Sequence, residues 1–284
     1  MVIAILTAMF IHLLVSNKAF QWRLMVDNMF TPPVLRGVVT TLELTLASMA
    51  IGIVLGTIVA VMRLSPNPIL AAVAWLYTWF FRAVPRLVLL TLAGNLGILW
   101  ARIEVGVPFD TQIGALFGIH DLHMRIFGIS ALELLSGFLA GMLALALSEG
   151  AYMAEIVRAG MNSIDTGQTE AAQALGMRRP LLLRRILLPQ AMRVIVPPTG
   201  NEVIAMLKDT SLVIAVPINS ELFFQLQQIG NRTYAVFPML VAACLWYLAM
   251  TSVLMVGQYF LERRFSRGHG TPREGRVRTG MVNK

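Results

Sequence analysis

Long apolar runs limit what this chain can fold into. Val34–Met62 and Tyr234–Phe260 each exceed the ~20 residues that an α-helix needs to cross the hydrocarbon core of a bilayer. Three further apolar stretches predict additional crossings, and they cover residues 69–100, 136–156 and 199–218. The sequence therefore predicts an all-α fold, a polytopic membrane helix bundle of about five core transmembrane helices.

The two ends of the chain differ from these runs. Met1–Ser16 is apolar but short for a span, and no basic residue precedes it, so a signal peptide is not expected. It is a possible extra N-terminal helix, and whether it crosses the membrane stays open. We divide the chain into an N-terminal segment with a polar linker (residues 1–33), a membrane domain (34–261) and a basic tail (262–284). The tail has too few apolar residues to be expected to order.

Composition supports the membrane assignment and excludes other classes. Only 13% of the 284 residues are charged, about half the share of a soluble domain. The net charge of +8 could suggest a nucleic-acid partner, but the basic residues lie beside apolar spans, where positive-inside topology explains them better. We therefore expect a lipid bilayer as the surroundings and no nucleic acid. The one cysteine, Cys244, lies in an apolar run, so disulfides play no part.

Basic residues also predict the orientation. The loop from Arg158 to Arg193 holds six arginines and the C-terminal tail holds seven basic residues, whereas loops 101–132 and 219–233 hold two and one. This asymmetry predicts that the 158–193 loop and the C-terminus face the cytoplasm.

The segment 158–198 is the longest polar, charge-bearing stretch between two apolar runs. Asp165 and Gln168 have capping-box spacing, which predicts a helix start. Gly176 suits the left-handed residue that ends a helix, and Pro180 suits the first turn of a second helix. Leu181–Leu188 is apolar on one side of that second helix. The pattern predicts a helix–glycine turn–helix device at the membrane surface, which alternatively could be a basic amphipathic hairpin lying on lipid.

The spacing of residues in this segment resembles the EAA loop of binding-protein-dependent ABC transporter permeases. The matching positions are Glu170, Ala171, Ala172, Gly176, Ile186, Leu188 and Pro189. The resemblance implies a cytoplasmic coupling helix that sits in a cleft on an ATPase subunit. In that reading Glu170 makes the polar contact, the two alanines allow close approach, and Gly176 sets the turn.

Three more motifs resemble the polar amino acid subgroup of these permeases. They are Thr41–Thr45, Phe81–Pro85 and Leu207–Leu212, and with the loop they extend the resemblance over roughly residues 35–265. The chain departs from the subgroup at Ala83-Val84, where Gly-Thr is usual, and at Arg86, where an apolar residue is usual. The resemblance implies a half-pore that pairs with a second permease subunit, the same chain or a homologous one. The pair would sit on a cytoplasmic ATPase dimer and receive substrate from an extracytoplasmic solute-binding protein.

Charged residues inside an apolar run are the other candidates for function. The candidate translocation pathway comprises Glu202, Lys208, Asp209, Thr210 and Ser211. Charges at such a depth are costly unless they face the bundle interior or water. Glu202 and Asp209, seven residues apart, lie on nearly one helical face and could offer carboxylates to an amino group. The alternative is that they form salt bridges, for instance with Arg82 or Arg86.

No motif of an enzyme or of a cofactor site occurs in the sequence. The P-loop, the Gly-x-Ser-x-Gly elbow and the His-Glu-x-x-His helix are all absent. His120 and His123 have the spacing of a metal pair but no third ligand, so no metal or cofactor is expected.

Without a nucleotide site, the expected importer takes its energy from ATP hydrolysis in a separate partner subunit. The alternative is a gradient-driven secondary transporter, although no internal repeat is evident. A membrane-embedded enzyme would need a nucleophile or metal set beside the carboxylates, and none accompanies them.

Overall fold

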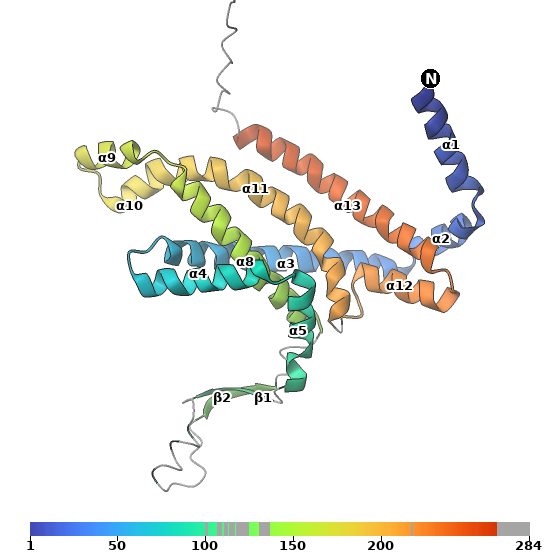
Figure 1. The fold of residues 1–284 in the computed structure, drawn as a ribbon, viewed down its shortest axis with the longest axis horizontal. Coiled ribbons are helices and arrows are strands. Elements are labelled where there is room, and N and C mark those ends of the chain that lie inside the picture. Colours follow the sequence, from blue (N-terminus) through green and yellow to red (C-terminus); the bar gives the residue numbers. More distant parts are fainter. Residues whose placement is uncertain are drawn as a thin grey trace, which may run out of the picture.

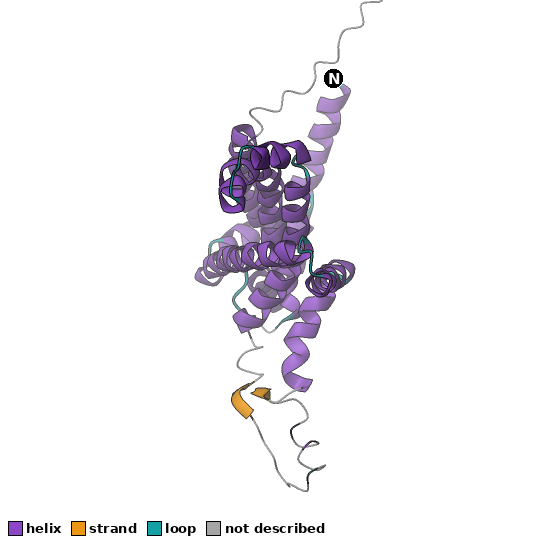
Figure 2. Ribbon diagram, turned by 90° about the vertical axis from the view of Figure 1, so that its left-hand side faces the viewer, coloured by secondary structure: helices purple, strands orange, loops and turns teal. Residues whose placement is uncertain are grey.

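The computed structural model describes residues 1–99, 102–106, 110, 113, 117, 125–130, 137–216 and 218–265. This part of the chain is an elongated bundle of long helices with a small hairpin projecting from it (Figures 1 and 2). The first half contains α1 (Val2–Ser16), a 3-10 turn (Lys18–Phe20), α2 (Trp22–Met29), α3 (Pro32–Arg63), α4 (Pro68–Ala83), α5 (Arg86–Leu99), β1 (Arg102–Gly106) and β2 (Arg125–Ser130). The second half contains α8 (Gly137–Asn162), α9 (Thr166–Ala174), α10 (Arg179–Leu182), a π-helical turn (Leu183–Leu187), α11 (Leu188–Asp209), a 3-10 turn (Thr210–Ala215), α12 (Leu222–Thr233) and α13 (Val236–Phe265).

The membrane-crossing helices agree with the sequence prediction in most places. In the described part, α3, α8 and α13 are each long and apolar enough to cross a bilayer. Two bent pairs raise the number to five if each counts as one span: α1 with residues 18–29, bent by 58°, and α4 with residues 86–96, bent by 103°. The run predicted at 199–218 forms the end of α11, which is not among these candidates because polar residues interrupt its hydropathy.

The core forms where α3 and α8 approach each other most closely. A Cβ atom added to Gly52 would lie 2.8 Å from Cγ of Glu149, and one added to Gly56 would collide with Met153. The small-residue pair on α3 therefore serves close helix packing, as its spacing predicts. Leu44, Met49, Leu90, Leu145, Met206 and Val213 complete the largest buried cluster. This contact holds α8 and α11 against α3 and fixes the position of their polar side chains.

The break between α4 and α5 lies deeper than predicted. Pro85 ends α4, as expected, because its ring and missing N–H disrupt a continuous helix. From the sequence alone, Pro85 predicts a kink near the cytoplasmic end of this helix, where Arg82 and Arg86 could both reach the membrane surface. However, α4 starts at the end of the bundle that carries α9 and α10 (Figure 1), and Ala83 is about 22 Å farther along it. Arg86 is therefore inside the bundle, with only 12% of its side chain exposed.

A β-hairpin replaces part of the loop expected at 102–132. β1 and β2 pair antiparallel, with Ile103 opposite Ile129 and Val105 opposite Phe127. These β-branched and aromatic pairs favour a strand ladder, which the mixed composition of the segment concealed. The His120/His123 pair and the tail from residue 266 lie outside the described residues.

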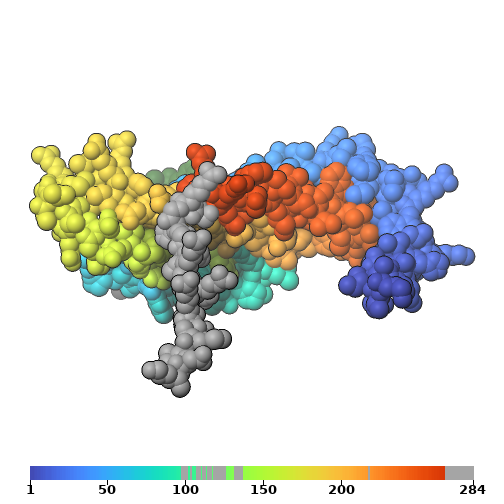
Figure 3. Space-filling model, turned by 90° about the horizontal axis from the view of Figure 1, so that it is seen from above, coloured from blue at the N-terminus to red at the C-terminus, as the bar shows by residue number. Residues whose placement is uncertain are grey.

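The segment 158–198, which we call the coupling segment, and the N-terminal helices lie at opposite ends of the bundle (Figure 3). Residues 166–187 form the end that lies beyond α8 and the start of α11. At the other end, α2 packs against α13, whereas α1 has no buried residue at all. The apolar surface of α1 is exposed, and together with residues 18–29 this helix forms one of the two bent pairs that could each count as a single span.

Candidate functional site

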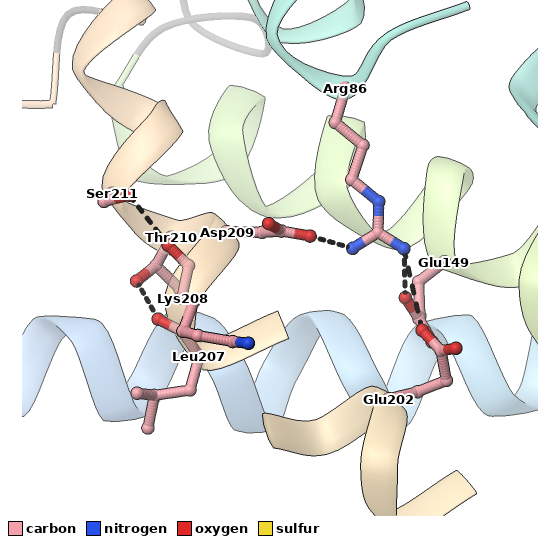
Figure 4. Close-up of polar contacts among 8 residues, drawn as sticks. All are labelled: Arg86, Glu149, Glu202, Leu207, Lys208, Asp209, Thr210 and Ser211. Atoms are coloured by element: carbon pink, nitrogen blue, oxygen red, sulfur yellow. Dashed lines mark hydrogen bonds and ion pairs between the residues drawn. The ribbon is translucent and has the colours of Figure 1, made fainter. Parts of the chain in front are cut away.

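A cluster of one guanidinium and three carboxylates lies where α5, α8 and α11 meet (Figure 4). Arg86 starts α5 directly after the break, and its side chain points toward α8 and α11. Its Nη2 lies 2.8 Å from Oε2 of Glu149 and 3.9 Å from Oε2 of Glu202. Its Nη1 donates a hydrogen bond to Oδ2 of Asp209. We call these four residues the Arg86 cluster.

Burial differs sharply across the Arg86 cluster. The Glu149 side chain is fully buried, and its Oε1 has no hydrogen-bond partner among the described residues. Glu202 and Asp209 are 25% and 30% exposed. Glu149 is thus held by Arg86 in a dry position, while the other two carboxylates are accessible. With all four groups ionised, the cluster carries two negative charges more than its guanidinium can balance.

Helical periodicity explains how α11 contributes two carboxylates to the Arg86 cluster. Glu202 and Asp209 are seven residues apart, which is about two turns or 10 Å of helix. Both reach the same guanidinium, as expected for residues on one helical face. The alternative prediction, that Glu202 and Asp209 form salt bridges, is therefore confirmed with Arg86 as the partner. Arg82 forms no ion pair with a described residue.

The other candidates for the pathway face elsewhere. Lys208 is exposed and lines a separate groove between α11 and α13, beside Gln258 and Glu262. The hydroxyl groups of Thr210 and Ser211 donate to the backbone carbonyls of Leu207 and Lys208, at 2.8 and 2.7 Å (Figure 4). These two bonds satisfy carbonyl groups where α11 changes into a 3-10 turn. The structure thus brings Glu202 and Asp209 together and leaves the other three outside the Arg86 cluster.

Tyr152 is a member of the site that sequence reasoning missed. Its ring centroid lies 4.7 Å from Cζ of Arg86 and 5.6 Å from Cζ of Arg82, within the range of cation–π attraction. The available signal was its position one turn after Glu149 on α8. Arg86 itself was signalled by its departure from the subgroup pattern.

The coupling segment has the local geometry that its sequence predicts. The Asp165 side chain accepts a hydrogen bond from the N–H of Gly167 at the start of α9. Gly176 has φ +73°, and the N–H groups of Gly176 and Met177 donate to the carbonyls of Gln173 and Ala172. This pair of bonds is a Schellman motif, which ends a helix sharply.

The exposed side of this segment carries most of the residues matched to the loop motif. Glu170, Ala171, Gly176, Leu188 and Pro189 are exposed, Ile186 is half-buried, and Ala172 is buried. The second helix continues through a π-helical turn directly into α11. The segment is therefore continuous with the helix that bears Glu202 and Asp209, and Pro197 and Pro198 lie in that helix between the π-helical turn and Glu202.

Within the part of the chain that the structure describes, no group of three or more His, Cys, Asp or Glu side chains could hold a metal ion. The carboxylates of the Arg86 cluster are instead arranged around the positive charge of Arg86.

Several known proteins are similar to this chain in sequence or in structure. The arginine transport system permease protein ArgU of Corynebacterium glutamicum is 44% identical over 267 residues, covering 94% of this chain and 79% of that protein. The probable amino-acid permease protein YxeN of Bacillus subtilis is 31% identical, covering 89% of this chain and 100% of YxeN. A crystal structure of an amino acid ABC transporter with histidines matches with a TM-score of 0.64 and 32% identity, covering 83% of this chain and 95% of the solved one.

A family model accounts for most of the sequence. Residues 52–267 match the model described as the binding-protein-dependent transport system inner membrane component. The prediction of an ATP-driven importer is therefore confirmed over the gradient-driven alternative, and ATP hydrolysis belongs to a partner subunit. Such a component works with an ATPase and a binding protein. The chain belongs to this family and is a multi-pass inner membrane permease subunit of an ABC transporter.

Proposed function

We propose that this chain forms the translocation pathway for a cationic amino acid in an ATP-driven importer. The observation that carries the proposal is that three carboxylates surround one guanidinium in the Arg86 cluster, where Glu202 and Asp209 stay partly exposed. A charge at membrane depth is costly without a counter-ion, so these carboxylates favour a ligand that brings one. The 44% identity to a permease named for arginine transport supports the same substrate class.

The coupling segment, residues 158–198, transmits the movement of the ATPase in this proposal. Glu170 makes the polar contact in the ATPase cleft, Ala171 and Ala172 allow close approach, and Gly176 sets the turn. Ile186, Leu188 and Pro189 join the segment to α11. Because a π-helical turn makes α10 and α11 continuous, a push on the segment is passed to the start of α11, the helix that carries Glu202 and Asp209 farther along.

The assembly follows from the same proposal. The membrane domain, residues 34–261, pairs with a second permease subunit, either the same chain or a homologous one. Two ATPase subunits bind on the cytoplasmic side, and an extracytoplasmic solute-binding protein delivers the substrate. The coupling segment and the basic tail, 262–284, face the cytoplasm, in agreement with their basic residues. Residues 1–33 form a peripheral N-terminal segment.

Uptake by the reconstituted transporter tests this function. The chain would be purified with its ATPase, placed in proteoliposomes and supplied with the binding protein. We expect ATP inside the vesicles to drive uptake of labelled L-arginine well above that of L-glutamate. Uptake that needs no ATP, or that follows an ion gradient instead, would contradict the proposal. Equal uptake of arginine and glutamate would contradict the substrate class alone.

A further inference from the structure

A basic groove opens along α4 at the end of the bundle that carries the coupling segment. It has a volume of about 320 Å³, and its lining includes Arg63, Trp75, Thr78, Trp79, Arg82 and Glu155. The members from α4 recur every three or four residues, so they form one stripe along that helix. The end of α3 and the middle of α8 complete the groove on either side of this stripe.

The groove carries an unbalanced positive charge. Arg63 donates to a backbone carbonyl at 3.3 Å, and Arg82 lies over the face of the Tyr152 ring. Neither guanidinium has a carboxylate within ion-pair distance among the described residues. The acid in the lining, Glu155, is already engaged, because two nitrogens of Arg158 bond it at 2.6 and 3.0 Å. The groove therefore offers two guanidinium groups to an anion.

Two tryptophans indicate that the groove lies at the level of the lipid headgroups. Trp75 and Trp79 are one helical turn apart, their rings stack at an interplanar angle of 11°, and both are about half exposed. Tryptophan is enriched where hydrocarbon meets headgroups, because its ring is apolar and its N–H is polar. The adjoining face of α4 is apolar and exposed at Val73, Leu76 and Phe80, as contact with acyl chains requires. The two guanidinium groups thus lie where lipid phosphates are found.

An anionic phospholipid combines the two features that the groove matches. Its phosphate accepts hydrogen bonds from guanidinium groups, whose planar fork fits phosphate oxygens in pairs. Its acyl chains need an apolar surface beside the phosphate, and the exposed face of α4 provides that surface. A basic pocket between membrane helices is a general way of binding such headgroups. A soluble anion would use the charge of the groove but not its apolar border.

We propose that this groove binds an anionic phospholipid, with the phosphate between Arg63 and Arg82 and the acyl chains over the apolar face of α4. The site goes beyond the proposed transport function, because its ligand is a membrane lipid and not the transported solute. The orientation proposed above places it in the cytoplasmic leaflet. Because Arg82 and Arg86 approach the same Tyr152 ring, the bound phosphate also offsets the repulsion between these two guanidinium groups.

Quenching of tryptophan fluorescence by brominated lipid tests the site in the complex of this chain with its ATPase. The complex is placed in phosphatidylcholine nanodiscs that contain a small share of brominated phosphatidylglycerol or, for comparison, the same share of brominated phosphatidylcholine. Bromine quenches indole rings that it touches, so a lipid held in the groove quenches Trp75 and Trp79. We expect phosphatidylglycerol to quench more strongly than phosphatidylcholine, and inorganic phosphate in the buffer to leave this excess quenching unchanged.

Two double variants test the contribution of the arginines. Arg63→Gln/Arg82→Gln should bind phosphatidylglycerol roughly 10- to 100-fold more weakly, because it loses charge-assisted hydrogen bonds. The matched control, Arg23→Gln/Arg36→Gln, removes two exposed arginines at the other end of the bundle and should keep the excess quenching. Quenching by phosphatidylcholine should be equal in all these chains, which shows that each variant is folded and inserted.

A third variant, Trp75→Phe/Trp79→Phe, keeps both arginines and removes the reporting rings, so the excess quenching should disappear. Persistence of the excess in this variant would place the lipid elsewhere and overturn the inference. Equal quenching by the two lipids in the wild type would also overturn it, as would an excess that survives in Arg63→Gln/Arg82→Gln or that is lost in the control as well. If inorganic phosphate abolishes the excess, the groove binds a soluble anion and the lipid site is refuted.

Discussion

Replacing Arg86 tests whether a single guanidinium holds the centre of the bundle together. Arg86→Leu introduces the residue type usual in the subgroup, but here it leaves Glu149 fully buried without the one charge partner that it has among the described residues. Removing one member of a buried ion pair costs about 3–5 kcal/mol. We therefore expect the free energy of unfolding of Arg86→Leu to fall by about that amount.

The double variant Arg86→Leu/Glu149→Gln separates this effect from simple loss of contacts. It removes both buried charges. Like Arg86→Leu, it also loses the hydrogen bond to the partly exposed Asp209 and the contact with Tyr152, together about 1–2 kcal/mol. The double variant should thus be more stable than Arg86→Leu alone, by about 2–3 kcal/mol.

Unfolding in mixed micelles, followed by tryptophan fluorescence during titration with a denaturing detergent, measures these differences. Arg82→Leu is the matched control, because Arg82 is exposed and forms no ion pair in the described part of the chain. It should lose less than about 1 kcal/mol. A double variant as unstable as Arg86→Leu would refute the reasoning, because the buried charge of Glu149 would then not be the cause.

Three further substitutions probe packing, coupling and a buried hydrogen bond. Gly52→Ala should lower the free energy of unfolding by about 1–3 kcal/mol in thermal unfolding, because the new Cβ would lie 2.8 Å from Glu149. Gly257→Ala is the control and should not destabilise, because a Cβ there meets nothing within 4 Å. Equal losses in the two variants would contradict this prediction. Gly176→Val should reduce recovery of the ATPase in affinity purification, whereas Gly176→Asn should keep it, because Asn tolerates the φ of +73° and a β-branched residue does not. Equal recovery with the two variants would contradict the role of the turn at Gly176 in binding the ATPase. Tyr247→Phe removes a 2.6 Å hydrogen bond to the buried Glu221 and should cost about 1–3 kcal/mol in the same unfolding assay, and an unchanged midpoint would show that the bond contributes nothing.

Local patterns predicted the parts of this molecule that local forces determine. The apolar runs at 34–62 and 234–260 became α3 and α13, because hydropathy and helix length need no tertiary information. The left-handed turn at Gly176 was also readable, since glycine is favoured wherever a helix ends in that conformation.

The Arg86 cluster depends on geometry that no local pattern contains. Periodicity placed Glu202 and Asp209 on one face of α11, and a salt bridge to Arg86 was one of two alternatives. The depth of Arg86 could not be predicted, because it follows from the 103° bend and from the direction in which α4 runs. The contacts with Glu149 and Tyr152 depend on how closely α8 packs against α3 beside the break.

The most direct test of the central claim is ATP-driven arginine uptake by Asp209→Asn beside the wild type. The substitution keeps the size of the side chain and removes one of the two accessible carboxylates of the Arg86 cluster. Asp27→Asn, at an exposed position on α2, is the matched control. If these carboxylates guide a cationic amino acid through the bundle, Asp209→Asn loses at least about 90% of uptake, a tenfold effect of one charged contact, while membrane insertion and ATPase recovery stay normal. Uptake at the wild-type rate in Asp209→Asn would contradict the claim.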